Sequence, residues 1–83
     1  MKTLKKEYRL EEAERLILQK ALRFNYDNLR VVRETLYFID QIWSMERGQT
    51  KTLEIEDAGI HITVTCTSRP NGYDELMERY IIE

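Results

Sequence analysis

The spacing of hydrophobic residues changes once along this chain, and that change decides its fold class. Up to Met45 the apolar residues follow the spacing of an α-helix, and from Thr50 they alternate with polar residues as in a β-strand. Gly48 lies between the two parts, and a glycine at this place is typical of a helix C-terminus. A helical part followed by strands within 83 residues predicts one α+β domain that spans residues 1–83.

The helical region, 9–46, contains an apolar stripe whose members are three or four residues apart. They are Leu18, Leu22, Asn25, Leu29, Val32, Leu36, Ile39 and Trp43, of which only Asn25 is polar. Because this register passes unchanged through residues 24–28, and no glycine or proline interrupts it, we expect one continuous long helix. Asn25, Asp27 and Asn28 leave an alternative open, since Asn and Asp cap helices and could start a second one in an αα-hairpin.

A second apolar row lies beside the stripe, so apolar residues cover more than half of the expected helix circumference. An ordinary amphipathic helix has an apolar arc of about a third of the circle. The excess predicts two packing partners, one the C-terminal half of this chain and the other a second copy. A homodimer would also add buried surface to a chain of 83 residues, which buries little by itself. The candidate dimer interface consists of Phe24, Val31, Phe38 and Ile42.

Residues 50–67 are expected to form an amphipathic β-hairpin. Its loop, Glu56–Gly59, ends in a glycine that can adopt a positive φ, and it pairs Ile55 with Ile60. With this register every apolar residue falls on one face of the hairpin. An isolated two-stranded hairpin is marginally stable, so this face must pack on the helical region.

A turn at Arg69–Gly72 is expected to end the hairpin, because proline and glycine suit turn positions there. Residues 72–82 follow with helical spacing and with acidic residues in the first turn, which predicts a short C-terminal helix. Ile81 and Ile82 leave open that the chain ends in a third strand. The favoured architecture is therefore a long N-terminal helix, or an αα-hairpin, followed by a β-hairpin and a short C-terminal helix (α-β-β-α).

The residues that could carry catalysis or hold a metal are few and scattered. His61 and Cys66 are five residues apart on one expected strand, and an odd spacing puts them on opposite faces. A zinc site needs at least three protein ligands, and the isolated glycines form no phosphate-binding loop. We therefore expect a non-enzymatic protein without cofactor or metal, in which Cys66 is a core residue and His61 pairs across the hairpin with Glu54.

One row on the polar side of the helical region is the candidate partner-binding surface. Arginines and tyrosines are interleaved in it at steps of three and four, as Arg23, Tyr26, Arg30, Arg33 and Tyr37. Both residue types are favoured at binding hot spots, because guanidinium groups pair with carboxylates or phosphates and tyrosine adds rigid contact area. The row predicts contact with an acidic protein surface or, less strongly, with a nucleic acid backbone.

The second half of the chain is acidic and offers the opposite kind of surface. Candidates for a secondary acidic surface are Glu54, Glu56, Asp57, Asp74, Glu75 and Glu78. The whole chain has a net charge of −2 and a sequence pI near 5.5, which argues against nucleic acid as the main partner.

Size, hydropathy and cysteine usage complete the functional expectation. No apolar run reaches the ~18 residues of a membrane span, the first residues lack the apolar core of a signal peptide, and one cysteine fits a reducing cytoplasm. In size and charge the chain is similar to small bacterial and phage proteins such as anti-repressors and anti-CRISPR proteins, a similarity that rests on no particular residues. We expect a small protein-binding regulator or inhibitor, and the alternatives are a nucleic-acid-binding regulator and a structural assembly subunit.

Overall fold

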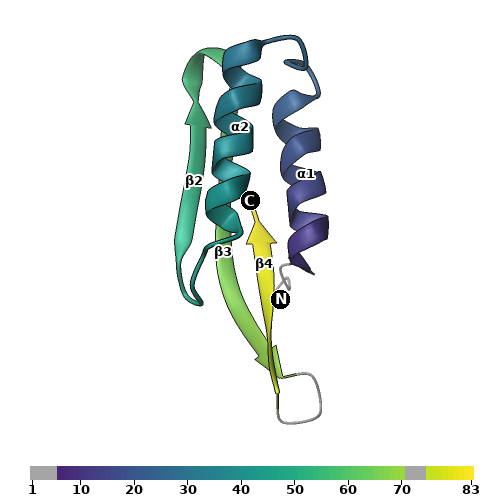
Figure 1. The fold of residues 1–83 in the computed structure, drawn as a ribbon, viewed down its shortest axis with the longest axis vertical. Helices are drawn as coiled ribbons and strands as arrows, with labels where there is room; N and C mark the ends of the chain where they lie inside the picture. The colour runs from purple at the N-terminus through teal and green to yellow at the C-terminus, as the bar shows by residue number, and fades with distance from the viewer. Residues whose placement is uncertain (1–5, 71–74) are drawn as a thin grey trace, which may run out of the picture.

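Two helices cover one face of a four-stranded antiparallel sheet in the computed structural model, which describes residues 6–70 and 75–83 (Figure 1). This arrangement confirms the α+β class. In chain order the elements are β1 (Glu7–Tyr8), α1 (Leu10–Leu22), α2 (Leu29–Ile42), β2 (Thr50–Ile55), a short 3-10 helix η1 (Glu56–Ala58), β3 (Ile60–Pro70) and β4 (Leu76–Ile82). The strands lie in the order β1-β4-β3-β2.

The expectation of one continuous helix is wrong, and the αα-hairpin is the arrangement found. Residues 23–28 connect α1 to α2, which lie side by side and run in opposite directions (Figure 1). Asn28 starts α2, because its side-chain oxygen accepts a hydrogen bond from the backbone N–H of Val31 at 3.3 Å. A helix over all of 9–46 would be about 55 Å long, which exceeds the 44 Å long axis of the described chain. Two shorter helices bury both halves on the same sheet.

The expectation of a C-terminal helix is also wrong, because residues 76–82 form β4. Cys66 pairs with Tyr80 and Val64 with Ile82, so β4 satisfies the second edge of β3. A helix here would have left the backbone N–H and C=O groups on that edge of β3 without strand partners. The expected turn lies partly outside the described residues, since 71–74 are not described.

The β2–β3 hairpin has the expected register. Ile55 pairs with Ile60, and Glu54 pairs with His61. Gly59 has a φ of +69°, in the left-handed region that a side chain would strain. Strand β3 continues to Pro70, past the expected limit at residue 67.

The core lies between the helical layer and one face of the sheet. Its buried residues are Ala13, Ile17, Ala21, Val31, Phe38, Ile39, Ile42, Met45, Leu53, Ile55, Ile60, Ile62, Val64, Cys66 and Tyr80. In the part of the chain that the structure describes, no helix covers the other face of the sheet (Figure 1). That face carries threonines in cross-strand pairs, with 3.1 Å between the hydroxyls of Thr50 and Thr65 and 3.3 Å between those of Thr52 and Thr63.

Candidate partner-binding surface

The row of arginines and tyrosines is divided by the loop between the helices. Arg23 follows the end of α1 and Tyr26 lies in the loop, whereas Arg30, Arg33 and Tyr37 share one side of α2. All five side chains are exposed. The continuous row therefore does not exist, but its last three members remain neighbours.

Arg30 joins the basic row to the acidic hairpin loop. Its guanidinium donates hydrogen bonds to both carboxylate oxygens of Asp57 at 2.5 Å. These hydrogen bonds, and then the charge of Arg30, hold the pKa of Asp57 below its ordinary value. The two candidate surfaces thus meet at the loop end of the molecule and partly neutralise each other.

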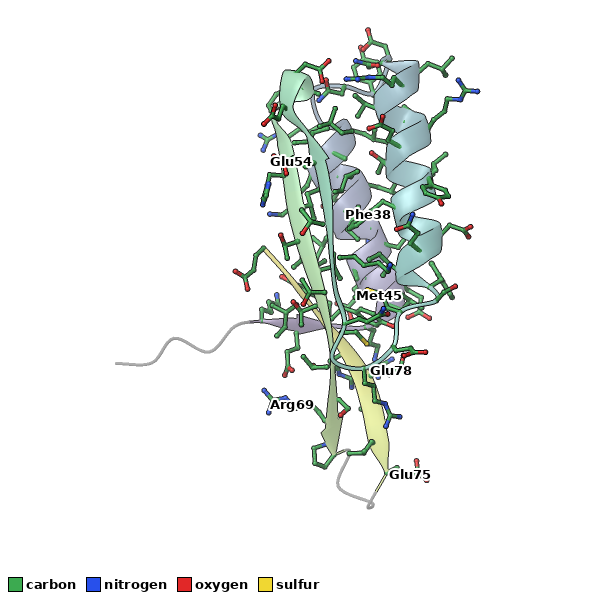
Figure 2. The ribbon with its side chains drawn as sticks, turned by 90° about the vertical axis from the view of Figure 1, so that its left-hand side faces the viewer. Phe38, Met45, Glu54, Arg69, Glu75 and Glu78 are labelled. Atoms are coloured by element: carbon green, nitrogen blue, oxygen red, sulfur yellow. The ribbon has the colours of Figure 1, made fainter. Side chains whose placement is uncertain are left out.

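The expected acidic surface is not one patch. Glu54 lies near the hairpin loop, whereas Glu75 lies at the opposite end of the molecule and Glu78 lies between the two, below Met45 (Figure 2). The reason is that β3 leads away from that loop and β4 begins at its far end, where Leu76 pairs with Pro70. Glu56 and Asp57 belong to η1 at the hairpin loop, and Asp74 lies outside the described residues.

A groove runs between α2 and the edge strand β2. Its apolar floor includes Phe38 and Leu53, and its volume is about 410 Å³. We call it the α2–β2 groove, and its lining residues are Arg33, Glu34, Tyr37, Phe38, Gln41, Thr52, Leu53 and Glu54. A neighbouring depression of about 390 Å³ shares Tyr37 and Gln41 and extends the groove towards Lys51. Two members of the basic row and one acidic candidate therefore line the same groove.

The free edge of β2 borders this groove. The backbone groups of Cys66 point to the β2 side, because its C=O accepts a hydrogen bond from Gly48 and its N–H donates one to Gln49. The backbone groups of Thr63 point to the other side, where they bond Glu83. The backbone groups of alternate β3 residues therefore face β2. By that alternation Thr50, Thr52 and Glu54 direct their backbone N–H and C=O groups outward. Among the described residues no strand pairs with this edge.

Lys51 limits what this edge can accept. It pairs with the fully buried Val64, so its side chain lies on the helix side of the sheet at the edge. A lysine in this position hinders the addition of an apolar strand, because its charge would be covered. Any segment that lies along β2 must offer Lys51 a polar or acidic neighbour.

Exposed apolar residues form a second feature of α2. Leu29, Leu36 and Trp43 are 70%, 52% and 50% exposed. They belong to the apolar stripe recognised in the sequence, and they face solvent because the neighbouring apolar row faces the sheet. The indole N–H of Trp43 donates a hydrogen bond to Glu14 of α1 at 3.1 Å.

The candidate dimer interface residues lie elsewhere than expected. Val31, Phe38 and Ile42 are buried in the core of the single chain, and Phe24 is 81% exposed in the loop between the helices. The three buried side chains are therefore not available to a second copy of the folded chain. Sequence periodicity found both apolar rows, but it could not tell which row faces the sheet.

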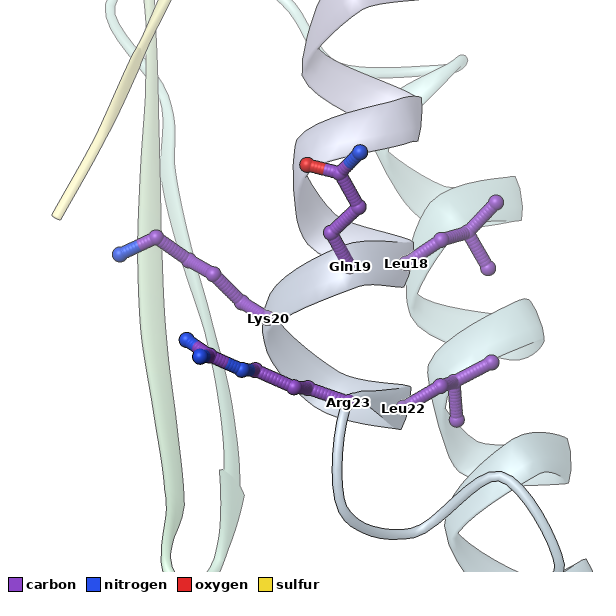
Figure 3. A pocket seen from close by; sticks show the side chains of 5 residues that line it. All are labelled: Leu18, Gln19, Lys20, Leu22 and Arg23. Carbon is purple, nitrogen blue, oxygen red and sulfur yellow. The ribbon is translucent and has the colours of Figure 1, made fainter.

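A shallow depression lies on α1, with a volume of about 540 Å³. Leu18 and Leu22 point to one side of it, and Lys20 and Arg23 point to the other (Figure 3). The guanidinium carbon of Arg23 lies 5.1 Å from the centre of the Phe24 ring. No acid faces these two cations in the depression, and nothing else in its lining indicates a ligand.

Cys66 and His61 lie apart, as expected. Cys66 is fully buried on the core face, where burial and then the charge of Glu78 raise the pKa of its thiol. His61 is exposed on the other face, 3.8 Å from Glu54 between Nδ1 and Oε2. Among the residues that the structure describes, no three His, Cys, Asp or Glu side chains come together as a metal site, and no helix is long and apolar enough to cross a membrane.

Comparison with known proteins gives no match: no family model, no curated protein and no solved structure is similar to this chain. The surface of the chain itself therefore carries the functional argument.

Proposed function

We propose that this protein is a small, non-enzymatic regulator or inhibitor that binds another protein through the α2–β2 groove. One observation carries the proposal. Tyr37 is 67% exposed, although it lies over a groove with an apolar floor. Tyrosine in such a position contributes rigid contact area when a partner covers it, and it is a residue type enriched at hot spots.

The polar groups around the groove favour a protein segment as the ligand. Arg33 makes no hydrogen bond or ion pair within the described residues, so its planar donors are free to pair with a carboxylate. Gln41 and the outward backbone groups of Thr52 add donors and acceptors of the kind that a peptide backbone satisfies. Lys51 favours an acidic residue at the near end of the segment.

The biological setting that we propose is the bacterial or phage cytoplasm, with a role similar to that of anti-repressors or anti-CRISPR proteins. Small size, a charged surface and a single buried cysteine support this setting.

Two alternatives have less support. A nucleic-acid-binding regulator would need clustered positive charge, but Asp57 neutralises Arg30, and Glu34 and Glu54 line the groove. A structural assembly subunit could join copies through the free edge of β2, which Lys51 hinders.

Affinity capture from the native host, with Tyr37→Ala and Phe24→Ala compared with wild type, tests the proposal. Both positions carry exposed aromatic rings, but only Tyr37 lines the groove. We expect a captured protein to bind wild type and Phe24→Ala alike, and Tyr37→Ala about 10-fold or more weaker. Calorimetry with the purified partner would measure these affinities.

Two results would contradict the proposal. One is a partner whose affinity is unchanged by Tyr37→Ala. The other is specific binding of nucleic acid whose affinity falls steeply with salt concentration, which would support the nucleic-acid alternative instead.

A further inference from the structure

The outward face of α2 has apolar residues arranged symmetrically about Leu36. Leu29 precedes Leu36 by two helical turns, and Trp43 follows it by the same interval. All three are at least half exposed, although large apolar side chains gain most when they are buried. The stripe spans about 21 Å along the helix.

Opposite charges flank Leu36 on the same face. Arg33 precedes it by three residues and Asp40 follows it by four, so both lie on the side of the helix that carries the stripe. Both are exposed, and within the described residues neither makes a hydrogen bond or an ion pair. A positive and a negative group on either side of a central leucine are self-complementary under a two-fold rotation.

We propose that this face is a homodimer interface, in which α2 packs antiparallel on α2 of a second copy. Leu36 meets its own counterpart at the two-fold axis, and Leu29 meets Trp43 of the partner subunit. Arg33 then faces Asp40 of the partner subunit, and the same pair forms again on the other side of the axis. A parallel arrangement would place arginine against arginine and aspartate against aspartate, so charge selects the antiparallel one.

The second copy is the occupant that this arrangement favours. An unrelated partner would need its own matching order of apolar and charged groups, whereas a second copy has that order by symmetry. Burial of the stripe would also add apolar contact to a chain that is too small to bury a large core. The interface borders the α2–β2 groove, because Arg33 also lines that groove and Asp40 lines the neighbouring depression. Tyr37 lies towards the groove rather than at the centre of the stripe.

Charge reversal tests the pairing. Arg33→Asp and Asp40→Arg each place like charges across the axis, so we expect each to weaken self-association at least about 10-fold. The double variant Arg33→Asp/Asp40→Arg restores opposite charges and should bring the dimer dissociation constant back to near the wild-type value. Sedimentation equilibrium measures the constants, and Lys20→Asp on α1 is the matched control that should leave dimerisation unchanged.

Each outcome of this experiment decides the proposal. A wild-type chain that stays monomeric, or a double variant no better than the single ones, would overturn it. Circular dichroism of each variant establishes that the helices still form, and exposed positions such as these tolerate substitution. Failure here leaves the groove proposal standing, because that proposal is tested by Tyr37→Ala and partner affinity.

Disulfide trapping at the axis gives an independent measurement. Leu36→Cys brings two thiols together in the proposed dimer, and mild oxidation should link the chains covalently. Thr63→Cys, on the uncovered face of the sheet, is the control that should not link. Cys66 is buried and does not compete. Equal crosslinking of both variants, or none of Leu36→Cys, would count against the two-fold axis at Leu36.

Discussion

Thr35 is a polar residue in the middle of the core. It is fully buried on α2, and its hydroxyl has no hydrogen-bond partner in the described structure. A buried hydroxyl without a partner costs folding free energy, since it gives up its hydrogen bonds to water. The apolar isostere valine removes that cost without changing the volume much.

We expect Thr35→Val to raise the free energy of unfolding by about 1 kcal/mol. Chemical denaturation followed by circular dichroism would measure the change. Thr63→Val is the control, because its hydroxyl lies 3.3 Å from that of Thr52 and the substitution should not stabilise. A Thr35→Val protein that is clearly less stable than wild type would indicate that the hydroxyl has a partner after all.

Arg30 and Asp57 offer a test by titration. The folded-state pKa of Asp57 is lowered mainly by the hydrogen bonds from Arg30, so the ion pair stabilises the fold above the unfolded-state pKa of ~3.9. That stabilisation is lost as the pH falls through the lower folded-state value. In Arg30→Ala we expect the Asp57 pKa, measured by NMR, to rise towards its ordinary value. An unchanged pKa would show that the pair does not form in solution.

The connection between α1 and α2 depends on the cap of α2. Asn28 supplies the only side-chain hydrogen bond to the start of this helix in the described chain. We expect Asn28→Ala to lower the free energy of unfolding by about 1 kcal/mol, and Asn28→Asp to retain most of the stability because aspartate also caps helices. Thermal unfolding of the three proteins measures both effects. Equal destabilisation by alanine and aspartate would contradict a capping role.

The elements differ in how well the sequence predicts them, and the reason is physical. The β2–β3 hairpin depends on local alternation and on a loop with Gly59, so its register follows from the residues themselves. Hydrophobic spacing did not predict the break between the helices. Leu22 and Leu29 are seven residues apart, close to two helical turns, so the register continues across the loop. Strand β4 was not predicted, because the sequence Tyr73–Ile82 also fits helical spacing. Only the pairing with β3 decides between a helix and a strand in this segment.

At the scale of the whole molecule, the hardest part to predict was which side chains come together on the surface of the folded chain. Arg30, Arg33 and Tyr37 stay together because they share one helix, which helical spacing does predict. The α2–β2 groove was not predicted, since it depends on how α2 packs beside an edge strand distant in sequence. Val31, Phe38 and Ile42 were assigned to a dimer interface because spacing alone does not reveal which apolar row the sheet covers.

The two proposed surfaces of α2 are adjacent and share Arg33 at their border. The side towards β2 forms the groove, and the outward side carries Leu29, Leu36 and Trp43. A dimer through the outward side would pair Arg33 at the border of the groove, so a partner segment would then bind through the rest of the lining, including Tyr37 and Gln41. Together these surfaces would cover Leu29, Leu36, Tyr37 and Trp43, which the chain's own core leaves exposed.

The mass of the protein in solution tests this account most directly. Light scattering at tens of micromolar should give twice the 10.0 kDa chain mass for wild type, and Leu36→Glu should reduce it to that of one chain. Leu76→Glu is the matched control, because Leu76 is 54% exposed and Leu36 is 52% exposed, but only Leu36 lies on α2. We expect a dimer for wild type and Leu76→Glu, and a folded monomer for Leu36→Glu. A wild-type mass of 10.0 kDa in a fully folded sample would contradict it.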